Sequence, residues 1–88
     1  MDWGAEAPEV VIVDPRLDIN EVRLAHLRAT AAAQKGWFHV AAQNYLYCLE
    51  AAQRYGNARA TAFFATHLVN TYKQMGMEDN AKHYGTIA

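Results

Sequence analysis

The stretch that decides the fold is residues 65–84, ATHLVNTYKQMGMEDNAKHY, in which one glycine separates two segments of helical character. Before the glycine, Leu68 and Tyr72 are four residues apart and therefore share one face of a helix. Gly76 stops that helix, because glycine adopts the left-handed cap conformation at little cost. Glu78 and Asp79 then favour the positive end of a new helix. The stretch predicts two helices joined by a tight turn.

A second unit of the same kind occurs earlier in the chain, centred on Gly36, 40 residues before Gly76. Alanines occur five residues after each of these glycines and eleven residues before each: Ala25, Ala41, Ala65 and Ala81. Alanine is the commonest residue of the chain, and the only prolines are Pro8 and Pro15, which favours helix after residue 15. The sequence predicts an all-α fold of two antiparallel helix-turn-helix hairpins.

Cap and stop residues predict the bounds of four helices. The first is expected to start after Asp14-Pro15 or at the capping box Asp18–Glu21, and to end at Lys35. The second is expected over 37–55 or 38–55, before Gly56. Asn57 is the expected N-cap of the third, which runs to Gly76, and the fourth begins near residue 78.

The beginning of the chain differs from this helical body. Residues 1–14 are predicted to form an acidic extended arm, and residues 15–88 the four-helix domain. Pro8 precedes the β-branched run of residues 10–13, which is typical of an extended segment. Within the arm, Trp3, Val11 and Val13 are the candidate docking residues, either on the chain's own helices or on a partner. Residues 1–21 hold six acidic residues against one arginine, or −5, whereas residues 22–77 hold six basic against one acidic, or +5.

Length and composition bound the class of protein. With 88 residues the chain forms one small domain, and 52% hydrophobic residues argue against a disordered chain. The single cysteine, Cys48, excludes an intramolecular disulfide scaffold and a four-cysteine zinc site. No apolar run has the length of a membrane span, and the first 20 residues are acidic where a signal peptide is positively charged. A cytoplasmic location is therefore expected.

The second unit resembles a tetratricopeptide repeat. Its apolar pair Leu68-Val69, Tyr72, the turn glycine Gly76 and Ala81 match the family's pattern, and the resemblance covers about residues 22–88. It implies that the first helix of each unit lines a groove that holds an extended segment of a partner protein. The groove residues implied by helical spacing are Arg23, His26, Thr30 and Gln34 on the first unit and Phe63, Thr66, Asn70 and Lys73 on the second. A plain four-helix bundle, with these side chains on solvated faces, is the alternative.

Catalytic and metal-binding patterns are not found in the sequence. There is no serine, no glycine-rich phosphate loop and no catalytic constellation of paired carboxylates in the helical body. Cys48 and His39 are nine residues apart on one expected helix, a rise of about 13 Å that is too long for a nucleophile and its base. The four histidines, His26, His39, His67 and His83, lack the spacing of metal ligands on a helix. We therefore expect no catalytic residue, no bound metal and no cofactor.

Two functions fit these features. The first is a non-enzymatic interaction or assembly module that binds a protein segment in a helical groove, with homo-oligomers formed through uncapped helix ends. The second is a small oligomeric accessory subunit that associates with nucleic acid through its basic helical body. The basic residues are spread along the chain and the leader is acidic, which favours the first function.

Overall fold

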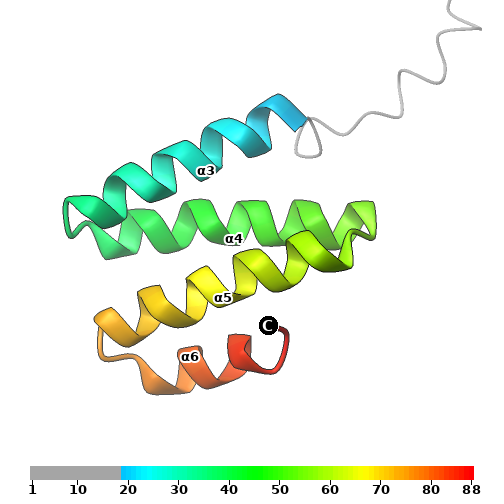
Figure 1. Ribbon diagram of the computed structural model, residues 1–88. Helices are drawn as coiled ribbons and strands as arrows, with labels where there is room; N and C mark the ends of the chain where they lie inside the picture. Colours follow the sequence, from blue (N-terminus) through cyan, green and yellow to red (C-terminus); the bar gives the residue numbers. More distant parts are fainter. Residues whose placement is uncertain (1–18) are drawn as a thin grey trace, which may run out of the picture.

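The computed structural model describes residues 19–88, and these form four α-helices. The helices are α3 (Ile19–Gln34), α4 (Phe38–Tyr55), α5 (Ala58–Gln74) and α6 (Glu78–Gly85). Consecutive helices run antiparallel, so α3 and α4 form one hairpin and α5 and α6 form another (Figure 1). The predicted all-α fold is confirmed over this range. Residues 1–18, which include the predicted arm and the capping residue Asp18, lie outside the described part.

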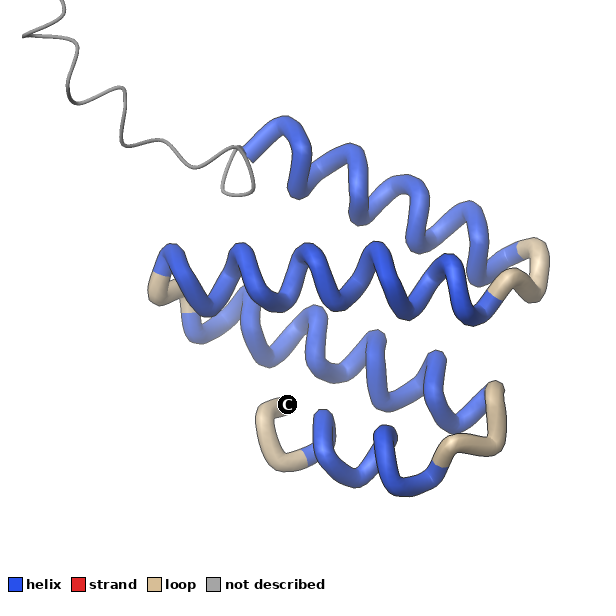
Figure 2. The backbone as a smooth tube through the Cα atoms, turned by 180° about the vertical axis from the view of Figure 1, so that it is seen from behind, coloured by secondary structure: helices blue, strands red, loops and turns tan. Residues whose placement is uncertain are grey.

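The four helices lie in an open row. α3 packs on α4, α4 on α5 and α5 on α6, whereas no comparable interface joins α3 to α6 within residues 19–88. Figure 2 shows the same order from behind. A closed four-helix bundle brings its first and last helices together around one core. The described helices therefore form an open row of two hairpins and do not close into a bundle.

All three turns of the row are built in the same way. Gly36, Gly56 and Gly76 are spaced 20 residues apart and have φ values of 80°, 71° and 73°. The residue after the glycine donates its backbone N–H back to the preceding helix, from Trp37 to Ala32 at 2.8 Å and from Met77 to Tyr72 at 2.9 Å. This is the Schellman pattern of helix ends, which favours glycine because a Cβ is strained at positive φ. The glycine stops predicted from sequence are thus confirmed.

The helix starts differ in how they are capped. The predicted N-cap of α5 is confirmed, because the Asn57 side chain accepts a hydrogen bond of 3.0 Å from the Ala60 backbone N–H. Neither Trp37 before α4 nor Met77 before α6 makes a side-chain cap. α3 ends at Gln34, one residue before the predicted end, because Lys35 belongs to the turn.

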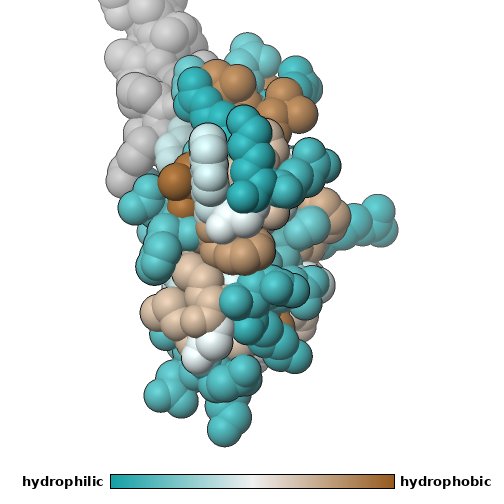
Figure 3. Space-filling model, turned by 90° about the vertical axis from the view of Figure 1, so that its left-hand side faces the viewer, coloured by the Kyte–Doolittle hydropathy of each residue, from teal (hydrophilic) through white to brown (hydrophobic). Residues whose placement is uncertain are grey.

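The core is made mostly of alanine. α3 buries only alanines, and Leu68 and Cys48 are the largest fully buried side chains among residues 19–88. Small side chains allow helices to approach closely, so the interfaces of this row depend on fit more than on bulk. The α3–α4 and α5–α6 turns lie on the same side of the molecule, and on that side apolar surface appears between polar side chains (Figure 3). Trp37, which is 56% exposed, belongs to the α3–α4 turn.

Candidate functional site

His26 brings α3 into contact with α5, the two helices that the resemblance to tetratricopeptide repeats implies should line a groove. Its ring lies edge-on to two neighbours of α5, with centroid distances of 5.6 Å to Phe63 and 5.4 Å to Phe64. The ring of His67, also on α5, lies 6.1 Å from His26. Two of the predicted groove residues, His26 and Phe63, are therefore brought together by the fold.

Tyr45 of α4 completes this group of rings. It stacks on His67 with a centroid distance of 4.8 Å and an interplanar angle of 9°, and it is almost fully buried. The ring of Phe63 lies edge-on to the ring of His67, with a centroid distance of 4.6 Å. Even so, 47% of Phe63 remains exposed. We call His26, Tyr45, Phe63, Phe64 and His67 the aromatic cluster. It presents one half-exposed phenyl ring that is held in place by its neighbours.

A hollow of about 350 Å³ adjoins the aromatic cluster on the side of the α3–α4 turn. Asn70 is a predicted groove residue that lines it, and its exposed amide offers both a donor and an acceptor to a peptide backbone. The other lining residues are Ala33, Phe38, Tyr45, His67, Thr71 and Gln74. The hollow and the half-exposed Phe63 together provide polar and apolar contacts along one surface.

The remaining predicted groove residues contribute less. The Thr30 hydroxyl donates to the His26 carbonyl at 3.0 Å, and the Thr66 hydroxyl donates to the Ala62 carbonyl at 2.9 Å. Both donors are thus used within their own helices, which is common for threonine in a helix. The rest are exposed: Arg23, Gln34 and Lys73.

Sequence reasoning missed Tyr45 and His67 as members of this surface. A signal for His67 exists, because it follows Phe63 by four residues and therefore shares its helix face. Tyr45 has no such signal, since its position under His67 depends on how α4 packs against α5. Another aromatic residue of α5, Tyr72, instead stacks on Tyr84 of α6, with a centroid distance of 5.6 Å.

The environment of His67 disfavours its charged form. Burial lowers the pKa of His67 below its ordinary value of 6.5, and the nearby His26 lowers it further by like-charge repulsion. A histidine whose pKa is depressed by folding binds a proton more readily in the unfolded chain. Stability is therefore lost as the pH falls below about 6.5 and through the lower pKa that His67 has in the folded chain.

We expect the His67→Gln variant to lose less stability on acidification than the parent protein. Thermal unfolding at pH 7.5 and pH 5.5 measures this, with the fall in Tm as the readout. His39→Gln, which removes an exposed histidine from α4, is the matched control. An equal fall in Tm for the parent and for His67→Gln would contradict the assignment.

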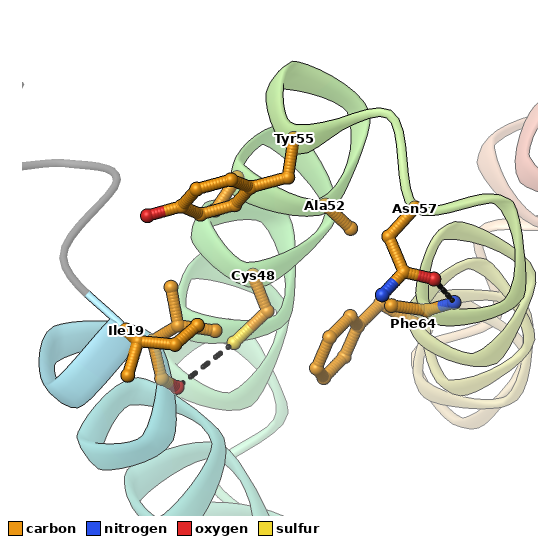
Figure 4. A pocket seen from close by; sticks show the side chains of 9 residues that line it. Ile19, Cys48, Ala52, Tyr55, Asn57 and Phe64 are labelled. Atoms are coloured by element: carbon orange, nitrogen blue, oxygen red, sulfur yellow. Dashed lines mark hydrogen bonds between the residues drawn. The ribbon is translucent and has the colours of Figure 1, made fainter.

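A second, more apolar pocket lies between the start of α3, the end of α4 and the start of α5 (Figure 4). Its volume is about 310 Å³. Ile19 and Tyr55 lie on one side and Phe64 on the other, with Ala52 and Cys48 between them. The other lining residues are Val22, Ala51, Asn57 and Ala60. Because Phe64 also contacts His26, this apolar pocket adjoins the aromatic cluster.

Cys48 lines the apolar pocket as a protonated thiol. Its side chain is buried, and its Sγ donates a weak hydrogen bond to the Val22 carbonyl at 3.5 Å. Burial raises the pKa of Cys48 to about 11, so the nucleophilic thiolate is scarce near neutral pH. This environment suits a small packing residue of the α3–α4 interface.

Several other predictions concern chemistry or residues away from these two surfaces. Within residues 19–88, no three side chains of the metal-ligating types gather in one place. None of the helices in that range combines the length and apolar character of a membrane span. The arm residues Trp3, Val11 and Val13 lie outside the described residues, so their docking stays a prediction.

Comparison with known proteins adds no assignment. Neither the protein-family models, nor the curated proteins, nor the solved structures contain a match to this chain. The function is therefore argued from the residues and geometry above.

Proposed function

We propose that this chain is a non-enzymatic protein-interaction module that holds a segment of a partner protein against α3 and α5. The observation that carries the proposal is the half-exposed ring of Phe63, which His26 and His67 hold in place. Aromatic side chains that are fixed by their neighbours make good interface anchors, because little conformational freedom is lost on binding.

The polar groups beside the anchor suit an extended segment. Asn70 lines the adjoining hollow, where its amide can pair with both a backbone N–H and a backbone C=O. Arg23 of α3 and Lys73 of α5 are exposed, and they provide positive charge for a carboxylate of the partner. The proposed partner is thus a peptide segment with an apolar residue for Phe63 and an acidic residue near it.

The resemblance to tetratricopeptide repeats is part of this proposal. It is supported by the open row of hairpins and by turns that repeat the same hydrogen bonds at Gly36 and Gly76. In such repeats the first helices of successive units line the binding surface. A cytoplasmic location is likewise proposed, on the support of the buried free thiol of Cys48.

The test is a capture experiment with the purified full chain as bait in cell extract, with each sample divided into nuclease-treated and untreated halves. Proteins retained by the parent chain are identified by mass spectrometry, and their affinity for Phe63→Ala is then measured. We expect Phe63→Ala to weaken binding about tenfold or more. A central aromatic anchor contributes about 2 kcal/mol or more to the binding free energy.

Trp37→Ala is the matched control, since Trp37 is an exposed aromatic residue that is neither a ring of the cluster nor a lining residue of the hollow. Binding by this variant should equal that of the parent. If Phe63→Ala binds as tightly as the parent chain, with an unchanged Tm, the α3–α5 surface is not the binding site. Loss of all captured proteins after nuclease treatment would instead favour the nucleic-acid-associated function.

A further inference from the structure

The apolar pocket lies beside the last turns of α4, which the described part of α3 leaves uncovered. The Val22 carbonyl meets the Cys48 thiol, so the antiparallel helices are aligned at this pair. Ile19 therefore lies about one turn further along, beside the last turns of α4, which continues to Tyr55. Ile19 and Tyr55 flank the pocket and are 55% and 52% exposed. Within residues 19–88, no fifth helix packs over them.

The residues that precede Ile19 are tethered to the edge of this pocket by the chain itself. Ile19 is both the first described residue and a lining residue, so the preceding chain departs from the edge of the pocket. Val13 precedes Ile19 by six positions, a length of chain that spans at most about 20 Å when extended. Asp14-Pro15, between them, is a pair that favours a reversal of chain direction. The β-branched run of residues 10–13 is thus tethered within reach.

We propose that the apolar pocket is the docking site of the chain's own segment 10–13. In an extended segment alternate side chains share one face, so Val11 and Val13 enter the pocket together while Val10 and Ile12 face away. The pocket suits them because most of its lining is aliphatic or aromatic. Docking covers the exposed Ile19 and Tyr55.

Charge complementarity supports the same occupant. Glu9 and Asp14 flank the segment, and residues 1–21 carry a net charge of −5. Next to the lining residues of the pocket, Arg54 precedes Tyr55 and Arg59 precedes Ala60, and both arginines are exposed. These arginines, on either side of the α4–α5 turn, attract an apolar segment with acidic flanks. They repel an apolar segment with basic flanks.

The test is nuclear magnetic resonance on the full chain with labelled methyl groups. We expect nuclear Overhauser effects between the methyl groups of Val11 and Val13 and the ring of Phe64, which lies across the pocket from Ile19. A mixed sample of differently labelled chains separates contacts within one chain from contacts between two. Contacts found only between chains would overturn the proposal in favour of a second copy as the occupant. Absence of these contacts in both samples would overturn it altogether.

Two matched double variants give an independent readout. Val11→Asp with Val13→Asp places charge on the docking face, whereas Val10→Asp with Ile12→Asp makes the same change in charge on the opposite face. We expect amide hydrogen exchange in the first turn of α3 to become about tenfold faster, or more, in the first variant only, since burial of the valines is lost. Equal exchange in the two variants would contradict docking by this face. Phe63 remains intact in both variants, so this outcome is independent of the proposed partner surface.

Discussion

Leu68→Ala is expected to lower the free energy of unfolding by about 2–5 kcal/mol, the largest loss that a single substitution in this core should cause. Leu68 of α5 is completely buried, whereas most of the core around it is alanine. Few large side chains are present to relax into the space, so a cavity remains after truncation. A chain of this size has a total stability of about 4–13 kcal/mol, and the variant therefore loses a large part of it.

Thermal or urea unfolding followed by circular dichroism measures this loss. For a domain of this length the fall in Tm should be about 10 °C or more. Leu27→Ala is the matched control, because Leu27 of α3 is 62% exposed and undergoes the same chemical change. We expect that control to remain within about 0.5 kcal/mol of the parent. Similar losses for the two variants would mean that Leu68 does not anchor the core as described.

Ala29→Leu is expected to destabilise the protein by about 1–3 kcal/mol for the opposite reason. Ala29 is completely buried, and α3 contributes only small side chains to the core: Ala25, Ala29 and Ala32. A leucine at position 29 has no space in the α3–α4 interface and forces the two helices apart. Since His26 lies one turn away on α3, the contact between His26 and Phe63 should weaken as well.

Urea unfolding of Ala29→Leu beside Ala31→Leu tests this expectation. Ala31 is exposed on the same helix, so the control makes the same substitution with the same change in helix propensity. We expect Ala31→Leu to be neutral or slightly stabilising. If Ala29→Leu is as stable as that control, a leucine fits into the α3–α4 interface and the expectation is wrong.

The helices and their turns could be predicted because their signals are local. Gly36, Gly56 and Gly76 stop their helices by an intrinsic backbone preference, and Asn57 caps α5 with its own side chain. The open arrangement of the hairpins could not be predicted in this way. It depends on which faces of α4 and α5 are buried together, and a pattern of alanines fits a closed bundle equally well.

The candidate site was predicted only in part, for the same reason. Helical spacing placed His26 and Phe63 on facing helices, and they do meet. It also selected Thr30, whose hydroxyl instead bonds to its own helix, and it missed Tyr45, which reaches the cluster from α4. The apolar pocket has no sequence signature, because it arises from the relative positions of two helix ends, at Ile19 and Tyr55.

The open row also determines how this molecule comes apart. α6 contacts α5 but makes no comparable interface with α3 or α4, and its buried residue is Ala81, next to the stacked pair Tyr72 and Tyr84. In linear arrays of this kind, units open one after another, and each opening costs only the interface with one neighbour. α6 can therefore fray while α3, α4 and α5 keep their mutual contacts. The surface proposed to receive a partner therefore stays intact when α6 frays, because its rings lie on α3, α4 and α5.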